Sequence, residues 1–183
     1  MLARKLRFFL LTLGVALGVL LLDRLSKAWV LETMPLYTEL DLLPALYPYF
    51  RLVHSANTGI AFGLFQNGTI LFTIIPAIAV VAIAVYAFRH GDASVLLSVS
   101  LGMMLGGAMG NLWDRIAYGA VVDFLSVRLS DNLIWPTFNL ADTFVVIGTG
   151  LLIFHFLLEE RRANAREEVS REGREQGVEK VGS

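Results

Sequence analysis

The sequence contains no cysteine and, along most of its length, little charge. The absence of thiols excludes disulfides, a cysteine nucleophile and thiolate metal sites. The three histidines are far apart and no HExxH segment occurs, so we expect no metal and no cofactor. There is no GxSxG segment and no phosphate-binding glycine loop. Since no basic stripe lies outside the termini, nucleic acid is not an expected partner.

Apolar residues dominate instead. Of the 183 residues 56% are hydrophobic and 17% are charged, and the mean hydropathy is +0.64. Soluble domains have about half apolar and about a quarter charged residues. Four apolar runs approach the roughly 20 residues that a helix needs to cross a bilayer. We therefore predict a mainly α membrane protein with four transmembrane helices, at about 8–31, 69–88, 94–112 and 140–158.

The first apolar run has a second interpretation as a cleavable signal peptide. Basic residues precede it, and Ala16-x-Gly18 loosely resembles a cleavage site. However, the apolar run continues to Leu22, and three further runs follow it. We interpret the first run as a retained membrane span.

The basic residues predict the orientation in the membrane. They precede the first span, lie between the second and third spans at Arg89, and follow the fourth span. Basic residues favour the cytoplasmic side, so both termini are expected there. Two outer loops, at about 32–68 and 113–139, then face outward. We divide the chain into a membrane domain, 1–158, and a charged cytoplasmic tail, 159–183, which is either a solvated helical extension or disordered.

The first outer loop is rich in aromatic and aliphatic residues. From Tyr49 to Ala61 the sequence is β-prone and interrupted by glycine. Short runs of this kind indicate strands joined by turns. We predict a small β-rich periplasmic element in this first outer loop.

Glycines recur at every fourth position in the third span, at Gly102, Gly106 and Gly110. One helix face without side chains lets a neighbouring backbone approach closely. We expect close helix packing there, and similar packing at Gly14 and Gly18 of the first span.

Polar side chains cluster at the outer ends of the spans, where an unpaired charge costs several kcal/mol. The members are Asp23, Lys27, Asn111, Asp114, Arg115, Asp123, Asn139 and Asp142. Several have a purely structural interpretation. Asp142 suits an N-terminal helix cap, Asp114 and Arg115 suit an interfacial charge pair, and Asp23 and Lys27 have the spacing of a helical ion pair.

Asp123 is harder to explain structurally, because it lies inside the apolar segment VVDFL. Two carboxylates in one low-dielectric site do not both ionise easily, which leaves one acid and one base able to activate water. Asp123 and Asp142 together therefore suit an aspartic peptidase. On these residues alone, a small transporter or channel subunit and a purely structural subunit remain open alternatives.

Five segments, in order along the chain, resemble the motifs of the lipoprotein signal peptidase (signal peptidase II) family. They are DRLSK at 23–27, NTGIAF at 57–62, GGAMGNLWDR at 106–115, VVDF at 121–124 and FNLAD at 138–142. The sequence departs from the motifs at Arg24, where a glutamine is usual, and at Ile60, where a small residue is more familiar. Neither departure touches the two aspartates, and we assign no role to Arg24.

The resemblance implies an aspartic endopeptidase of the bacterial inner membrane. Such an enzyme removes signal peptides from diacylglyceryl-modified prolipoproteins, cutting before the lipidated cysteine at the outer face. Prolipoproteins and membrane lipids are then its partners, and we expect it to act as a monomer. Asp123 and Asp142 correspond to the catalytic dyad. The remaining matched residues line the site or support it: Asn57, Gly59, Asn111, Arg115, Asn139, Asp23 and Lys27.

Overall fold

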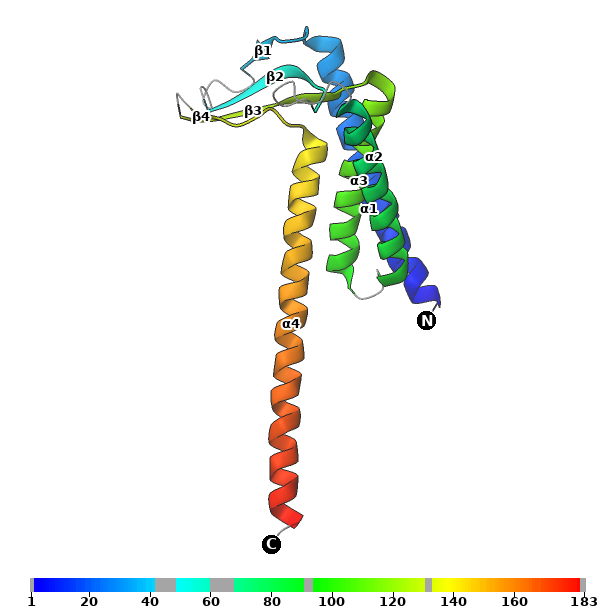
Figure 1. Ribbon diagram of the computed structural model, residues 1–183, viewed down its shortest axis with the longest axis vertical. Helices are drawn as coiled ribbons and strands as arrows, with labels where there is room; N and C mark the ends of the chain where they lie inside the picture. The colour runs from blue at the N-terminus through cyan, green and yellow to red at the C-terminus, as the bar shows by residue number, and fades with distance from the viewer. Residues whose placement is uncertain (1, 42–48, 60–67, 91–93, 131–132, 182–183) are drawn as a thin grey trace.

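A computed structural model describes residues 2–41, 49–59, 68–90, 94–130 and 133–181, and shows four long helices with a small antiparallel sheet at one end (Figure 1). The elements, in chain order, are α1 (Leu2–Thr33), β1 (Glu39–Leu40), β2 (Phe50–Asn57), α2 (Gly68–His90), α3 (Val95–Tyr118), β3 (Val121–Ser130), β4 (Leu133–Ile134) and α4 (Leu140–Val181). All four helices are long and apolar enough to cross a membrane. The prediction of a mainly α protein with four transmembrane helices is confirmed.

Three of the helices are clearly longer than their apolar runs. α1 begins before residue 8, α3 continues past residue 112, and α4 continues past residue 158 as one helix. Polar residues end an apolar run without ending a helix. The end of α3 is instead set by Gly119, whose φ of 73° is left-handed and whose N–H donates to the Arg115 carbonyl at 3.1 Å. The tail is a helical extension as far as Val181.

The glycine face of α3 packs against α1. A Cβ at Gly102 would lie 2.7 Å from the Thr12 carbonyl oxygen, and one at Gly106 would lie 2.8 Å from Cβ of Val19. The predicted close packing of α3 is therefore confirmed. The similar expectation for Gly14 and Gly18 is wrong, because a Cβ at either position would meet no described atom within 4 Å.

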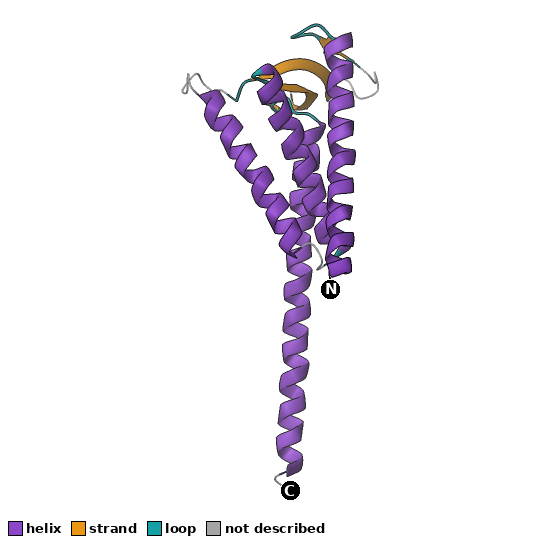
Figure 2. Cartoon of the chain, turned by 90° about the vertical axis from the view of Figure 1, so that its right-hand side faces the viewer, coloured by secondary structure: helices purple, strands orange, loops and turns teal. Residues whose placement is uncertain are grey.

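The central helix of the bundle is α3, which contacts each of the other three helices. In contrast, α2 diverges from its neighbours toward the sheet end (Figure 2). An apolar groove of roughly 370 Å³ lies between α2, α3 and α4. The residues that line it are Ala82, Ile83, Tyr86, Leu101, Met104, Leu152 and Phe156.

The sheet takes strands from both loops at its end of the bundle, in the order β1-β2-β3-β4. The predicted β-rich element in the first loop is confirmed as far as Gly59; Ile60 and Ala61 lie outside the described residues. The strands of the second loop, β3 and β4, were not predicted from the sequence. In β3 the first four residues are all buried, so the alternation that marks an exposed-face strand is absent.

β2 and β3 pair antiparallel, and their register is irregular between Leu52 and Ser55. Ser55 lies opposite Asp123 and Asn57 lies opposite Val121. Such irregularities aim side chains at functional sites in many sheets. Below the sheet, a buried cluster joins the end of α1 to both strands: Val30, Met34, Leu52, Val122 and Phe124. This cluster fixes the first residues of β3 against α1.

Candidate active site

Asp123 and Asp142 reach the same site from different elements. Asp123 is the third residue of β3, and Asp142 lies in the first turn of α4. The side chain of Asn139 caps this helix, since its Oδ1 accepts from the Asp142 N–H at 2.9 Å. In return, Oδ2 of Asp142 accepts from the Asn139 N–H at 3.2 Å. Asp142 is therefore a capping residue, as its structural interpretation held, but only one of its oxygens is used for that purpose.

Asp123 is buried and hydrogen-bonded at both oxygens. Only 1% of the residue is exposed. Oδ1 accepts from Nδ2 of Asn139 at 2.7 Å, and Oδ2 accepts from Nδ2 of Asn57 at 2.8 Å. The pKa of the Asp123 carboxyl is raised from 3.8 to about 6, mainly because the carboxyl is buried; the negative charge of Asp142 also raises this pKa, whereas the hydrogen bonds from Asn57 and Asn139 and the positive charge of Lys27 lower it.

Two buried amides connect the two carboxyl groups. Nδ2 of Asn111 donates to Oδ1 of Asp142 at 2.7 Å, while its Oδ1 accepts from Nδ2 of Asn139 at 3.0 Å. Because Asn139 also donates to Asp123, the bonded chain runs from one aspartate to the other. Asn111 is 9% exposed and Asn139 is fully buried. The relative position of the two acids is therefore set by side chains that have little freedom to move.

Behind the amides lies a buried ion cluster centred on Lys27. Its Nζ lies 2.8 Å from Oδ2 of Asp23 and 2.8 Å from Oδ2 of Asp114, and donates to Oδ1 of Asn111 at 3.0 Å. The expected pair of Asp23 with Lys27 is confirmed. The suggested pairing of Asp114 with Arg115 is wrong, because Asp114 instead pairs with Lys27 and Arg24. Since Asp23, Lys27 and Asp114 are fully buried, mutual pairing is what makes their charges tolerable.

A glycine makes room for this cluster beside α4. A Cβ at Gly110 would strike the carboxylate of Asp23, and would lie 3.5 Å from Cβ of Ala141. The same carboxylate accepts the Ala141 N–H through Oδ1 at 3.1 Å. Gly110 thus lets α1, α3 and α4 meet at one buried charge.

Asn57, Gly59 and Arg115 lie at the more open side of the site. Asn57 is exposed and Arg115 is half-buried. Gly59 has a φ of 76°, which disfavours other residues, and its N–H donates to Oδ1 of Asn57 at 2.9 Å, fixing that amide. Nη1 of Arg115 donates to the Asn111 carbonyl at 3.3 Å. Its buried Nε has no hydrogen-bond partner among the described residues.

The structure therefore brings the predicted residues of α1, β2, α3, β3 and α4 into one connected site. Two residues of the buried network, Arg24 and Asp114, were not predicted as site residues from the sequence. One signal was present: Asn111, Asp114 and Arg115 are spaced three and four apart, which places them on one face of α3. Nothing in the sequence pointed from Asp114 to Arg24, which lies on another helix.

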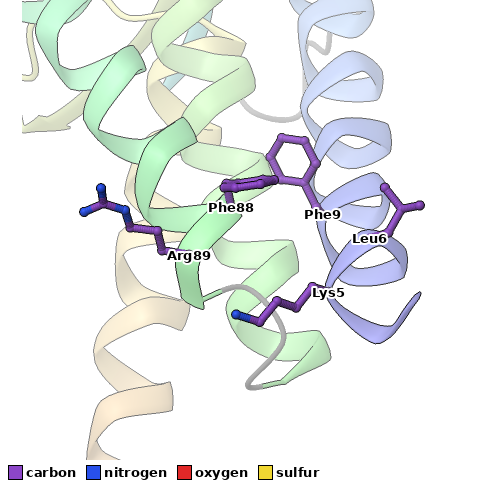
Figure 3. A pocket seen from close by; sticks show the side chains of 5 residues that line it. All are labelled: Lys5, Leu6, Phe9, Phe88 and Arg89. Atoms are coloured by element: carbon purple, nitrogen blue, oxygen red, sulfur yellow. The ribbon is translucent and has the colours of Figure 1, made fainter. Parts of the chain in front are cut away.

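No three His, Asp or Glu side chains converge as metal ligands in the part of the chain that the structure describes. His54 is occupied elsewhere, since its Nδ1 lies 2.7 Å from the Met34 carbonyl oxygen. A pocket of roughly 200 Å³ between α1 and α2 is lined by Lys5, Leu6, Phe9, Phe88 and Arg89 (Figure 3). It lies at the end of the bundle opposite the sheet, away from the aspartates.

Four helices long and apolar enough to cross a membrane, with two acids linked through amides at one end, define an integral membrane protein with an enzyme-like site. Two solved structures described as bacterial membrane enzymes have the same fold. One superposes with a TM-score of 0.71 at 25% identity, covering 81% of this chain and 88% of that chain. The other gives 0.72 at 26% identity, covering 80% and 92%.

The signal peptidase II family profile matches residues 15–158. The lipoprotein signal peptidase of Symbiobacterium thermophilum is 39% identical over 156 residues, which cover 85% of this chain and all of that protein. The lipoprotein signal peptidase of Moorella thermoacetica is 41% identical, over 79% of this chain and 91% of that protein. The chain belongs to the signal peptidase II family and is a multi-pass membrane peptidase.

Proposed function

We propose that this chain is an aspartic endopeptidase that removes signal peptides from diacylglyceryl-modified prolipoproteins and cuts before the lipidated cysteine. The proposal rests on one observation: the side-chain amides of Asn111 and Asn139 link Asp123 to Asp142 by hydrogen bonds. These bonds hold one buried carboxyl, whose pKa is raised to about 6, beside a half-buried carboxyl. Such a pair provides an acid and a base for one water molecule without a metal.

In this mechanism the pair takes a proton from water while water attacks the scissile carbonyl carbon. The same pair then supplies a proton to the leaving amine. Which carboxyl holds the shared proton at each step is a property of the pair. The half-buried guanidinium of Arg115 suits an electrostatic interaction with the substrate's carbonyl oxygen as negative charge develops there.

The membrane geometry fits such a substrate. The aspartates lie at the sheet end of the bundle, where a lipid-anchored cysteine would be held at the surface. The apolar groove between α2, α3 and α4 offers a surface for the apolar signal helix. Anchoring the substrate on both sides of the scissile bond fixes that bond against the dyad, which can remove several kcal/mol of the barrier.

The distribution of basic residues supports an orientation with both termini in the cytoplasm. Membership of the signal peptidase II family supports the bacterial inner membrane as the location. The N-terminus and the far end of α4 lie on the same side of the bundle, opposite the sheet (Figure 1). The site then faces the periplasm or outer surface. All of its residues lie within residues 1–158, which we propose as the peptidase domain, and we propose that the enzyme acts as a monomer.

The test is cleavage of a lipid-modified prolipoprotein in detergent by wild-type protein, Asp123→Asn and Asp142→Asn. We expect both variants to lose nearly all activity, because each change removes one of the two groups that handle protons. Asp41→Asn is the matched control, since Asp41 is an exposed acid paired only with Arg51 among the described ion pairs. Mass spectrometry of the product should place the new N-terminus at the modified cysteine. Full activity in either dyad variant would refute the mechanism.

A further inference from the structure

The residue immediately before each aspartate of the dyad is held by a buried carboxylate. The Val122 N–H, next to Asp123, donates to Oδ2 of Asp114 at 3.2 Å. The Ala141 N–H, next to Asp142, donates to Oδ1 of Asp23 at 3.1 Å. In both places a backbone hydrogen bond links the aspartate's own element to a different helix. The position of Asp123 is therefore tied to the position of the Asp114 carboxylate on α3.

The Asp114 carboxylate is itself held by two cations. Lys27 lies 2.8 Å from Oδ2, and Arg24 pairs with Oδ1. The ammonium group of Lys27 forms ion pairs with Asp23 and Asp114 and also donates a hydrogen bond to Asn111. The ion pairs described for Arg24 go to Asp114 alone, so Arg24 is the cation dedicated to this carboxylate.

Arg24 is in turn fixed against the end of α3. Its Nη2 donates to the hydroxyl of Tyr118 at 3.3 Å. The guanidinium carbon lies 5.9 Å from the ring centre of Tyr118 and 5.8 Å from that of Trp113. Cation–π contacts to two rings, together with this hydrogen bond, restrain a guanidinium more than they would restrain a lysine ammonium. Only 23% of the Arg24 side chain is exposed.

Together these contacts form a continuous path: Arg24 on α1, Asp114 on α3, the Val122 amide on β3, and then Asp123. We propose that Arg24 and Asp114 are positioning residues for the proteolytic step, which hold the start of β3 so that Asp123 keeps its place opposite Asp142. Arg24 stands at a position where the sequence departs from the family motif. The proposal rests on the peptidase function proposed above.

The test compares kcat and KM of wild-type protein, Arg24→Gln, Asp114→Asn and the double variant on a lipid-modified prolipoprotein in detergent. Arg24→Gln should lower kcat about tenfold with little change in KM, because a small displacement of a reacting group slows chemistry without weakening binding. Arg24→Lys keeps the charge and should recover part of this kcat. In the Asp114→Asn background, Arg24→Gln should have no further effect, because the path is already broken. Arg162→Gln is the control, since it removes a cation from an exposed pair in the tail.

Tyr118→Phe gives a milder second perturbation that keeps the ring and removes only its hydrogen bond to Arg24. It should lower kcat in the same direction by a smaller factor, even if Asp114→Asn does not fold. An Arg24→Gln enzyme with wild-type kcat would overturn the proposal, as would a loss that appears only in KM or in the yield of folded protein. Additive effects of Arg24→Gln and Asp114→Asn would also overturn it. A wild-type protein that fails to cleave would instead overturn the proposed function, and this proposal with it.

Discussion

Replacing Asp123 by asparagine should change how protein stability depends on pH. The folded state raises the pKa of this carboxyl from 3.8 to about 6, so between these values the folded protein binds more protons than the unfolded chain. Stability contributed by this group is then fully present below pH 3.8 and is lost as the pH rises through about 6. The loss in the free energy of unfolding reaches about 3 kcal/mol once the carboxyl is ionised, since a change of one pKa unit corresponds to about 1.4 kcal/mol.

The asparagine variant cannot ionise, so it escapes this loss. It has a cost of its own, because one amide N–H2 must face the donor Nδ2 of Asn57 or Asn139; that cost is about 1–3 kcal/mol and does not depend on pH. The measurable signature is the difference in Tm between variant and wild type. That difference should increase in favour of the variant by about 6–12 °C between pH 4 and pH 8.

The assay is thermal unfolding in one detergent across this pH range, followed by the fluorescence of the three tryptophans. Asp41→Asn serves as the control, because it makes the same chemical change at an acid that is exposed to solvent. A Tm difference between Asp123→Asn and wild type that stays constant from pH 4 to pH 8 would refute the reasoning. It would mean that the buried carboxyl is not destabilising when charged, and the acid–base role proposed for it would lose its electrostatic support.

Two further predictions concern packing and the tail. Gly110→Ala should lower the free energy of unfolding by about 1–3 kcal/mol and reduce cleavage, because the new Cβ would strike the Asp23 carboxylate. Gly14→Ala is the control, since a Cβ there would meet no described atom within 4 Å. It should behave like wild type in the same unfolding and cleavage assays. Equal Tm values for the two alanine variants would contradict this account. Deleting residues 159–183 should leave kcat unchanged, since this part of α4 extends away from the bundle on the side opposite the sheet (Figure 1). A loss of activity in the purified truncated protein would place part of the function in the tail.

The four spans could be predicted from the sequence because apolar length is a local property. The membrane-facing part of each helix is visible in a single run of residues. The ends of the helices were harder to predict from the sequence. α3 continues to Tyr118 because its polar residues are compatible with a helix, and the helix ends only at Gly119. The strand β3 was missed because its first residues are buried on both sides, so no alternating pattern marks it.

The sequence predicted which residues belong to the site better than it predicted the hydrogen bonds and ion pairs between them. Motif residues such as Asn111 and Asn139 could be assigned to the site, but the bonds between them depend on how three helices meet. The pairing of Arg24 with Asp114 joins residues 90 positions apart. No local pattern encodes a contact of that kind, and the neighbouring Arg115 offered a simpler partner in the sequence. The structure was needed to show that Asp114 faces inward and Arg115 toward the open side of the site.

The reciprocal cap formed by Asn139 and Asp142 has a further consequence for the dynamics of the protein. The first turn of a helix normally frays, opening and closing with little effect on the rest of the molecule. Here the two groups that close the end of α4 also bond to Asn111 and Asp123. Opening of this helix end therefore separates the two aspartates in the same event. Amide protons at the start of α4 should exchange with solvent only as often as the enzyme passes through an inactive form.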